Sequence, residues 1–244
     1  FMEKKSLYII TGASKGLGMA LKNALLKLPH TSVIGISRSA QKPEDNFTPI
    51  QLDLGDAKSL IDKIAQIFPE GAYEEIVLIN NAGWIGEIAY NGNLSPEAIV
   101  SIHAVNVIAP ALLMNSFMKT YKHHEGSKII VNISSGAAAK VVDGWSGYSA
   151  SKAALNQMTM IAQRESDLKN MGFKLFALSP GVIDTPMQAT IRSARQNEFS
   201  SLSKFKSLKE EGTLSTPEDI AQKVLYLIAH PNEFTEVLQD VRRF

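Results

Sequence analysis

The chain has 244 residues, of which 45% are hydrophobic and 20% charged, and its formal net charge is +1 at pH 7. This length and apolar content predict one globular domain, expected over residues 2–244, and the near-neutral charge argues against nucleic acid or an anionic membrane as a partner. The absence of cysteine excludes disulfides, thiolate catalysis and zinc bound through sulfur. We find no apolar run approaching the roughly 20 residues of a membrane-spanning helix, and therefore expect a cytoplasmic protein without a membrane partner.

Short runs of aliphatic and β-branched residues predict buried strands, and they alternate with longer stretches of helical apolar spacing. In chain order, the expected strands are residues 7–11, 32–37, 50–52, 76–80, 128–133 and 174–179. The expected helices are residues 18–27, 57–67, 96–121, 148–170 and 217–230. Because parallel strands need a long return path, this alternation predicts an α/β fold with a parallel sheet and helices on both faces.

Residues 184–214 interrupt the alternation, since they are mixed in charge and rich in Ser, Lys and Glu. They lie between the last strong strand and the last helix. Loops at the carboxyl ends of strands line the ligand crevice in sheets of this kind, so we expect a lid over a site at about 184–214. A pair of surface helices is the alternative.

A glycine-rich turn, TGASKGLG at residues 11–18, joins the first strand to the first helix. Gly12, Gly16 and Gly18 would let the backbone bend tightly and approach a pyrophosphate, whose charge is favoured by the N–H groups at a helix N-terminus. The spacing differs from the G-x-G-x-x-G fingerprint, and an ordinary tight loop is the alternative. The position after the first strand favours a dinucleotide-binding turn.

The second strand ends at Arg38 and Ser39, where a domain that prefers NAD typically carries an acidic residue for the ribose hydroxyl. An arginine there suits a 2′-phosphate, and Lys15 in the glycine turn adds a second cation. The sequence therefore predicts NADP(H) as the cofactor. Each cation taken alone is also consistent with a solvated surface charge.

Tyr148 and Lys152 lie four residues apart in a strongly helical segment, so both side chains share one helix face. An ammonium about 4 Å from a phenol, at an effective dielectric near 20, would interact by roughly 4 kcal/mol, or about three pKa units. We therefore expect Lys152 to lower the pKa of Tyr148 from about 10 toward neutrality, where a phenol exchanges protons efficiently.

Ser134 and Ser135 end the strand at 128–133, at the edge of the sheet where ligands bind in such folds. A hydroxyl at this place can donate to a substrate carbonyl. Both serines are equally compatible with a capping role in a loop.

Taken together, these motifs resemble the short-chain dehydrogenase/reductase family, in order and at the family's spacing. The resemblance rests on TGASKGLG at 11–18, Asp53, NNAG at 80–83, Asn106, Ser135, Tyr148 with Lys152, and Pro180-Gly181 followed by Thr185. It implies a single Rossmann-type, doubly wound domain with a seven-stranded parallel sheet, whose last short strand falls near residues 236–241.

The resemblance also implies a role for each catalytic residue. Tyr148 would be the general acid or base, and Lys152 would tune its pKa and bind the nicotinamide ribose. Ser135 would orient the carbonyl, and Asn106 would hold a water that passes protons to Lys152. The implied cofactor contacts are Gly12, Ser14, Lys15, Gly16, Leu17, Gly18, Arg38, Ser39, Asp53, Leu54, Asn80, Ala82, Gly83, Tyr148, Lys152, Pro180, Gly181, Val182, Ile183 and Thr185.

A narrower likeness, to the sepiapterin reductase branch, rests on Gly144-Trp145, on DTPMQ at 184–188 and on LKEEG at 208–212. Bacterial proteins similar to that branch include reductases of benzil that give the S-hydroxyketone. Pro186 departs from the branch, and Asp240 only approximately meets its acidic pterin anchor. We therefore expect a vicinal diketone or aromatic ketone as substrate.

The substrate contacts expected on this basis are Ser135, Trp145, Tyr148 and Met187. Phe199 and Phe205 are compatible with a pocket or with the core. Three alternatives stay open: a sepiapterin-type pterin side-chain reductase, a regulatory protein that binds NADP without catalysis, and an enzyme that oxidises an alcohol.

Two further expectations concern metals and assembly. The five histidines lie on helices or at helix ends without metal-ligand spacing, so no metal site is expected. The segments 96–121 and 148–170 are apolar on more than one face, which predicts burial against a second copy in a homodimer.

Overall fold

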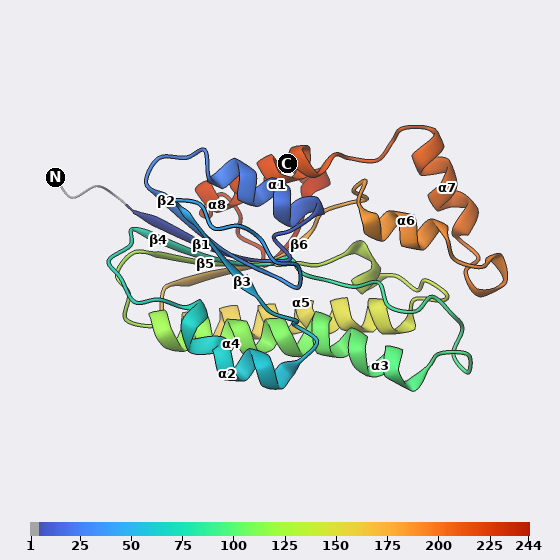
Figure 1. The fold of residues 1–244 in the computed structure, drawn as a ribbon, viewed down its shortest axis with the longest axis horizontal. Coiled ribbons are helices and arrows are strands. Elements are labelled where there is room, and N and C mark those ends of the chain that lie inside the picture. The colour runs from blue at the N-terminus through green and yellow to red at the C-terminus, as the bar shows by residue number, and fades with distance from the viewer. Residues whose placement is uncertain (1–4) are drawn as a thin grey trace.

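The computed structural model describes residues 5–244, and it contains one seven-stranded sheet in the order β3-β2-β1-β4-β5-β6-β7, with every neighbouring pair parallel (Figure 1). Strand order reverses beside β1, because β1 pairs with both β2 and β4. The strands are β1 (Ser6–Thr11), β2 (Thr31–Ser37), β3 (Phe47–Gln51), β4 (Glu75–Asn80), β5 (Ser127–Ile133), β6 (Phe173–Ser179) and β7 (Leu238–Asp240). The doubly wound α/β fold expected from the sequence is confirmed.

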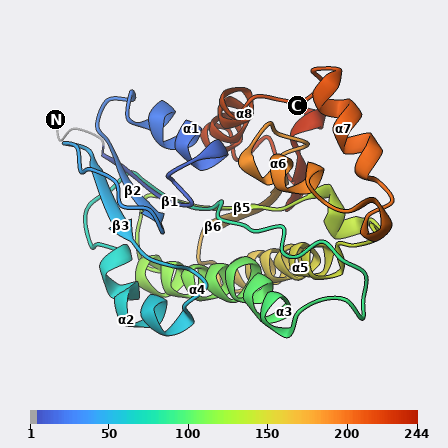
Figure 2. The same cartoon turned by 45° about the vertical axis from the view of Figure 1, so that its right-hand side comes forward.

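Helices cover both faces of the sheet. Figures 1 and 2 show α1 (Gly16–Leu25) and α8 (Pro217–Ala229) on one face, and α2 (Ala57–Ile67), α4 (Ala109–Tyr121) and α5 (Ser146–Leu168) on the other. Alternate side chains of each central strand enter opposite cores; Ile10 packs with the α1 and α8 side, and Ile9 with the α2 and α4 side.

Several boundaries differ from those expected. The third strand spans Phe47–Gln51 rather than residues 50–52, and its Pro49 is tolerated because β3 lies at the edge of the sheet. The first helix begins at Gly16 and the long fifth helix at Ser146, each two residues before the expected start.

Residues 96–121 form one continuous helical segment with a π-helical turn in its middle. It comprises α3 (Pro96–His103), a π-helical turn (Ala104–Ile108) and α4. Contrary to expectation, Pro96–Tyr121 is long and apolar enough to cross a membrane by length and composition alone, with a mean hydropathy of 1.7. In this fold its buried side packs on the sheet, where Leu113 and Phe117 are fully enclosed.

Residues 184–214 form helices rather than an open loop. They contain α6 (Pro186–Arg192), the 3-10 turn Gln196–Glu198 and α7 (Leu202–Glu210). Figure 2 shows α6 and α7 at the end of the sheet where the strands finish. The helix pair is therefore present, and it lies where a lid would lie.

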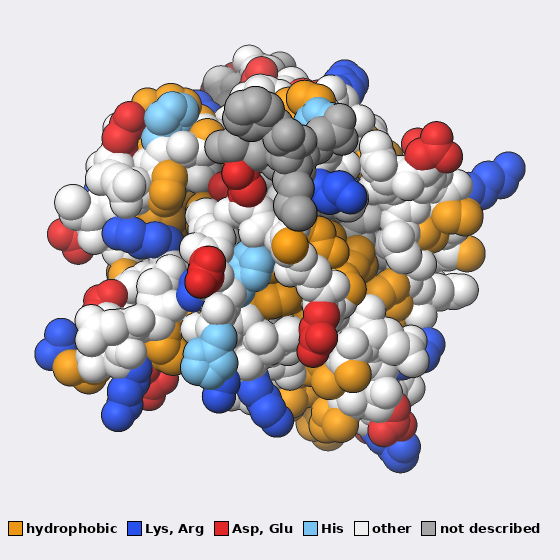
Figure 3. All heavy atoms as spheres, turned by 90° about the vertical axis from the view of Figure 1, so that its left-hand side faces the viewer, with side chains coloured by type: hydrophobic (Ala, Val, Ile, Leu, Met, Phe, Trp, Pro, Cys, Tyr) orange, Lys and Arg blue, Asp and Glu red, His pale blue; other side chains and the backbone are white. Residues whose placement is uncertain are grey.

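Met2, at which the domain was expected to begin, lies outside the described residues. On the face shown in Figure 3, basic and acidic side chains are interspersed.

Candidate active site

The glycine turn closes tightly around its own backbone. A Cβ at Gly18 would lie 2.2 Å from the Gly12 carbonyl oxygen, and Gly12 has a φ of +71° with Asn81 Nδ2 3.0 Å from its Cβ position. Larger side chains are therefore excluded at both positions. The turn is a backbone cradle of the kind that approaches a pyrophosphate.

The N-terminus of α1 has no side-chain cap, and the same is true of α5, α6 and α7. Asp56, Ser95 and Thr216 cap α2, α3 and α8 with side-chain oxygens, whereas Lys15 at the N-cap of α1 makes no side-chain capping bond. The first N–H groups of α1 remain available to an external acceptor, beside the positive end of the helix dipole. This arrangement fits the diphosphate of a dinucleotide cofactor.

The end of β2 lies beside this turn, because the Gly12 N–H donates to the Ile36 carbonyl at 2.7 Å. Arg38, Ser39 and Lys15 are all exposed there. Further along this edge, the carboxylate of exposed Asp53 accepts the N–H of Gly55 at 2.9 Å, and Leu54 is buried.

The two asparagines of the NNAG motif make different contacts. The amide of Asn80 is buried and donates to Asn132 Oδ1 at 2.8 Å, within the sheet. Asn81 instead holds the glycine turn, donating from Nδ2 to the Thr11 carbonyl at 2.9 Å. The Thr11 hydroxyl accepts the N–H groups of Asn81 and Ala82. Thr11 and Asn81 were missed as site residues, although both lie within the motifs quoted.

Lys152 is buried at 3% exposure and reaches the carboxyl end of β5, where its Nζ donates to the Ile133 carbonyl at 2.8 Å. The same Nζ lies 5.9 Å from the centre of the Tyr148 ring. Gly83 adjoins both Lys152 and Asn106, since its Cβ position is 3.4 Å from Lys152 Nζ and 3.7 Å from Asn106 Oδ1. The structure thus brings three expected site residues together beside Tyr148.

The predicted net fall in the pKa of Tyr148 is wrong for this fold. Burial raises the pKa of Tyr148 above its usual 10, and a hydrogen bond with the Ser135 side chain only partly opposes this. Burial also lowers the pKa of Lys152 to about 8. An ammonium about 4 Å away in a well-screened medium would lower the pKa of the phenol, but removing a phenolate from water acts in the opposite direction.

Asn106 sits in the π-helical turn, which is a frequent feature of functional sites. Its side chain makes two hydrogen bonds with the backbone of Trp84: Oδ1 accepts the N–H at 2.9 Å, and Nδ2 donates to the carbonyl at 2.8 Å. Nδ2 also donates to Ser151 Oγ at 3.0 Å, and that hydroxyl donates to the Tyr148 carbonyl at 2.7 Å. Asn106 therefore links the loop after β4 to the helix that carries Tyr148.

The two serines after β5 make different contacts. Ser134 is buried and donates to Asn156. Ser135 is partly exposed, caps the short 3-10 turn Gly136–Ala139 by accepting the Ala137 N–H at 3.1 Å, and interacts with Tyr148. Ser135 is thus both a capping residue and a neighbour of the phenol.

The segment after β6 returns to the glycine turn. Thr185 Cγ2 lies 3.3 Å from the Cβ position of Gly16, and Gly181 takes a φ of +72° after buried Pro180. Val182 and Ile183 pair with Ser215, which anchors this segment to the chain entering α8. Residues 180–185 therefore lie across the end of the sheet, next to the cradle.

An aromatic cluster adjoins the phenol. Trp145 is 7% exposed, meets Tyr148 edge-on at 5.5 Å between ring centres, and stacks on Phe199 at 5.3 Å with an interplanar angle of 15°. Phe205 also packs on Trp145 at 5.3 Å, and Met187 from α6 packs against the same cluster. Three of the four expected substrate contacts, Trp145, Tyr148 and Met187, thus share one apolar cluster.

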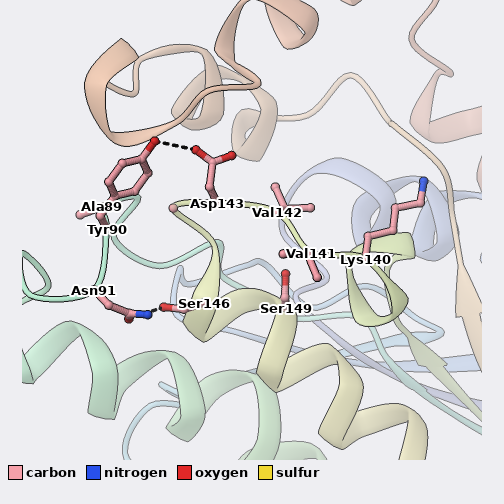
Figure 4. Close-up of a pocket in the computed structure, with 10 residues that line it drawn as sticks. Ala89, Tyr90, Asn91, Lys140, Val141, Val142, Asp143, Ser146 and Ser149 are labelled. Atoms are coloured by element: carbon pink, nitrogen blue, oxygen red, sulfur yellow. Dashed lines mark hydrogen bonds between the residues drawn. The ribbon is translucent and has the colours of Figure 1, made fainter.

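A hollow of about 540 Å³ lies between the loops after β4 and β5. Figure 4 shows Tyr90, Asn91, Val141, Val142 and Asp143 on its walls. Its lining also includes Gly144, Ser146 and Ser149, which are sequence neighbours of Trp145 and Tyr148, but not those two residues themselves. Elsewhere in residues 5–244, no group of three or more His, Asp and Glu side chains is placed to hold a metal ion.

Comparison with known proteins gives a consistent result. A family model described as short chain dehydrogenase matches residues 6–196. A benzil reductase ((S)-benzoin forming) from Bacillus subtilis is 36% identical over 98% of this chain and 99% of its own, and a sepiapterin reductase from Bos taurus is 27% identical over 92% and 90%. A solved short-chain dehydrogenase/reductase from Saccharomyces cerevisiae shares the fold, with a TM-score of 0.82, 24% identity and coverage of 97% and 96%.

Proposed function

Because the chain belongs to the short-chain dehydrogenase/reductase family, we propose that it is an NADPH-dependent reductase of a vicinal diketone or aromatic ketone, giving an S-hydroxyketone. It is an oxidoreductase of that family. The observation that carries the proposal is the grouping of Tyr148, Lys152 and Ser135 beside a backbone cradle suited to a dinucleotide.

The reaction uses a hydride from the nicotinamide and a proton from the protein. Tyr148, with its raised pKa, is a neutral phenol at pH 7 and can donate that proton to the carbonyl oxygen. Ser135 can donate a hydrogen bond to the same oxygen as negative charge develops on it. Protonated Lys152 stabilises the phenolate left behind.

A diketone substrate is supported by the polar groups of the aromatic cluster. The indole N–H of Trp145 is buried and has no hydrogen-bond partner among the described residues. Indole nitrogen only donates, and a buried donor without a partner is costly. A second carbonyl oxygen next to the one being reduced would supply the acceptor.

The preference for NADPH is supported by the exposed cations at the end of β2 and in the glycine turn. Arg38 and Lys15 are both exposed, and a 2′-phosphate would be favoured by a bidentate guanidinium and a nearby ammonium. We further propose that residues 184–214 form a lid over the site. We also propose a cytoplasmic location, which imaging of a tagged protein in cells would test.

Turnover measured by NADPH absorbance with benzil, a simple aromatic aldehyde and sepiapterin tests the proposal. We expect the highest kcat/KM with benzil and formation of the S-hydroxyketone on a chiral column. A higher value with sepiapterin would replace the substrate by a pterin. Tight NADPH binding without turnover of any carbonyl would indicate a regulatory protein instead.

A further inference from the structure

Glu198, at the end of the turn before α7, is a carboxylate with 6% exposure. Both its oxygens are engaged by the loop after β4. Oε2 accepts the Tyr90 N–H at 2.7 Å, and Oε1 accepts Nδ2 of Asn93 at 2.8 Å. The lid segment is therefore tied to a loop more than a hundred positions earlier in the chain.

Asp143 makes a second tie, from the loop after β5. Oδ2 accepts the Ser200 N–H and the Tyr90 hydroxyl, each at 2.8 Å, and Oδ1 accepts the Ser200 hydroxyl at 2.7 Å. Figure 4 shows the bond between Tyr90 and Asp143 at the wall of the hollow. Hydrogen bonds from the Tyr90 N–H to Glu198 and from the Ser200 N–H to Asp143 hold the pKa of both carboxyls below the usual range, so both are charged at neutral pH.

The residues between these ties belong to the aromatic cluster. Gly144 lies so close to the lid that a Cβ there would be 2.3 Å from the Glu198 carbonyl oxygen. Phe199, fully buried between Glu198 and Ser200, stacks on Trp145, which in turn meets the Tyr148 ring. A continuous series of contacts thus runs from the two carboxylates to the candidate proton donor.

We propose that Glu198 and Asp143 are positioning residues, which fix Phe199 and Trp145 as one wall of the substrate pocket beside Tyr148. They act through Phe199 and Trp145 rather than on the reacting atoms. The inference rests on the proposed function in taking Tyr148 as the proton donor. Together, the hydrogen bonds of Glu198 and Asp143 form a clamp. When this clamp is lost, the packing of Phe199 and Trp145 loosens and substrate binding weakens, while the glycine turn that would hold the cofactor is unaffected.

Three variants test whether Glu198 acts through its hydrogen bonds. Glu198→Ala removes both acceptors, and we expect the KM for benzil to rise at least about tenfold, with kcat within about threefold and NADPH affinity unchanged. Glu198→Gln keeps an acceptor for the Tyr90 N–H, and its NH₂ can donate to Asn93 once that amide flips, so we expect a KM within about threefold of the parent. Glu210→Ala, which removes an exposed carboxylate from α7, is the matched control and should match the parent.

A second measurement, the fluorescence of Trp145, tests the packing of this residue without any substrate. The chain has two tryptophans, so a Trp84→Phe background leaves Trp145 as the single fluorophore. In that background we expect Glu198→Ala to increase quenching of Trp145 by acrylamide, and Glu198→Gln to leave it near the parent value.

Parent-like KM and quenching in Glu198→Ala would overturn the inference, as would equal losses in the Ala and Gln variants. If Glu198→Ala does not fold, Ser200→Ala, which removes one bond to Asp143, should still raise both the KM and the quenching, and no change in either would overturn the inference. If the parent itself reduces no carbonyl, the proposed function fails. The quenching experiment then still shows whether Glu198 holds Trp145 in place.

Discussion

Lys152 and Tyr148 share one buried site, and burial favours the neutral form of each. It lowers the pKa of Lys152 to about 8 and raises that of Tyr148. Between neutrality and pH 8 the pair therefore consists mainly of an ammonium and a neutral phenol, which is the combination that donates a proton. Its charge state favours reduction of a carbonyl over abstraction of a proton from an alcohol.

This pair predicts a pH dependence of reduction. As the pH rises through about 8, Lys152 loses its proton and can no longer stabilise a phenolate on Tyr148. The kcat/KM for benzil at saturating NADPH should therefore be level from pH 6 to 7.5 and fall by about tenfold per unit at higher pH. A profile that stays flat to pH 10 would contradict this role of Lys152.

The proposed preference for NADPH rests on single residues. Arg38→Ala should lower the ratio of kcat/KM with NADPH to that with NADH by about ten- to a hundredfold, because charge-assisted hydrogen bonds to the 2′-phosphate are lost. Lys42→Ala, which removes a nearby exposed cation, is the control and should leave the ratio unchanged. Equal activity with both cofactors in the parent would disprove the NADP preference.

At the scale of elements, the contact between the loop after β5 and the 3-10 turn Gln196–Glu198 depends on one glycine. Gly144→Ala adds a methyl group 2.3 Å from the Glu198 carbonyl oxygen at a φ of +73°. We expect a loss of about 2–4 kcal/mol in unfolding free energy, or a melting temperature roughly 4–16 °C lower. Gly212→Ala is the matched control, since its φ is +65° but its Cβ position is open. Equal destabilisation of the two variants would show that the close approach to the lid contributes nothing.

The elements themselves were largely predictable from sequence. The strands β1, β2, β4, β5 and β6 were expected from their apolar runs, because a strand covered on both faces is largely apolar. The edge strand β3 was located only in part, since its sequence FTPIQ is mixed. The short β7 was expected only through the family resemblance, since three residues carry too little pattern. The helices within 184–214 were left open, because their polar composition hides the few side chains that pack inward, such as Phe199.

The candidate site was predictable where its chemistry lies within a local motif. Tyr148 and Lys152 are one helical turn apart, and the glycine turn is contiguous in sequence. The clamp of Asp143 and Glu198 could not be found in this way, because its partners are between 53 and 108 positions away and no spacing marks them. The pKa of Tyr148 was missed for a similar reason, since the degree of burial is a property of the assembled fold.

For the whole molecule, the helical face formed by α3, α4 and α5 predicts a second copy of the chain. Ile108, which ends the π-helical turn before α4, and Ile161 in α5 are 45% and 48% exposed, and Figures 1 and 2 show α4 and α5 side by side. We propose a homodimer that buries them, as the apolar surface of an isologous interface would be buried.

Light scattering at micromolar concentration tests this assembly. The parent should have the mass of a dimer, and the double variant Ile108→Glu with Ile161→Glu should have that of a monomer. Leu28→Glu, equally exposed at 45% near α1, should remain a dimer. A monomeric parent would disprove the assembly.

The central claim concerns proton transfer by Tyr148, and the variant Tyr148→Phe tests it most directly. It removes one hydroxyl from a buried ring and leaves the contact with Trp145 in place. With NADPH and benzil we predict that kcat falls by about 10²–10⁴-fold, while NADPH affinity and melting temperature stay close to those of the parent. Undiminished turnover by a correctly folded Tyr148→Phe protein would contradict the account.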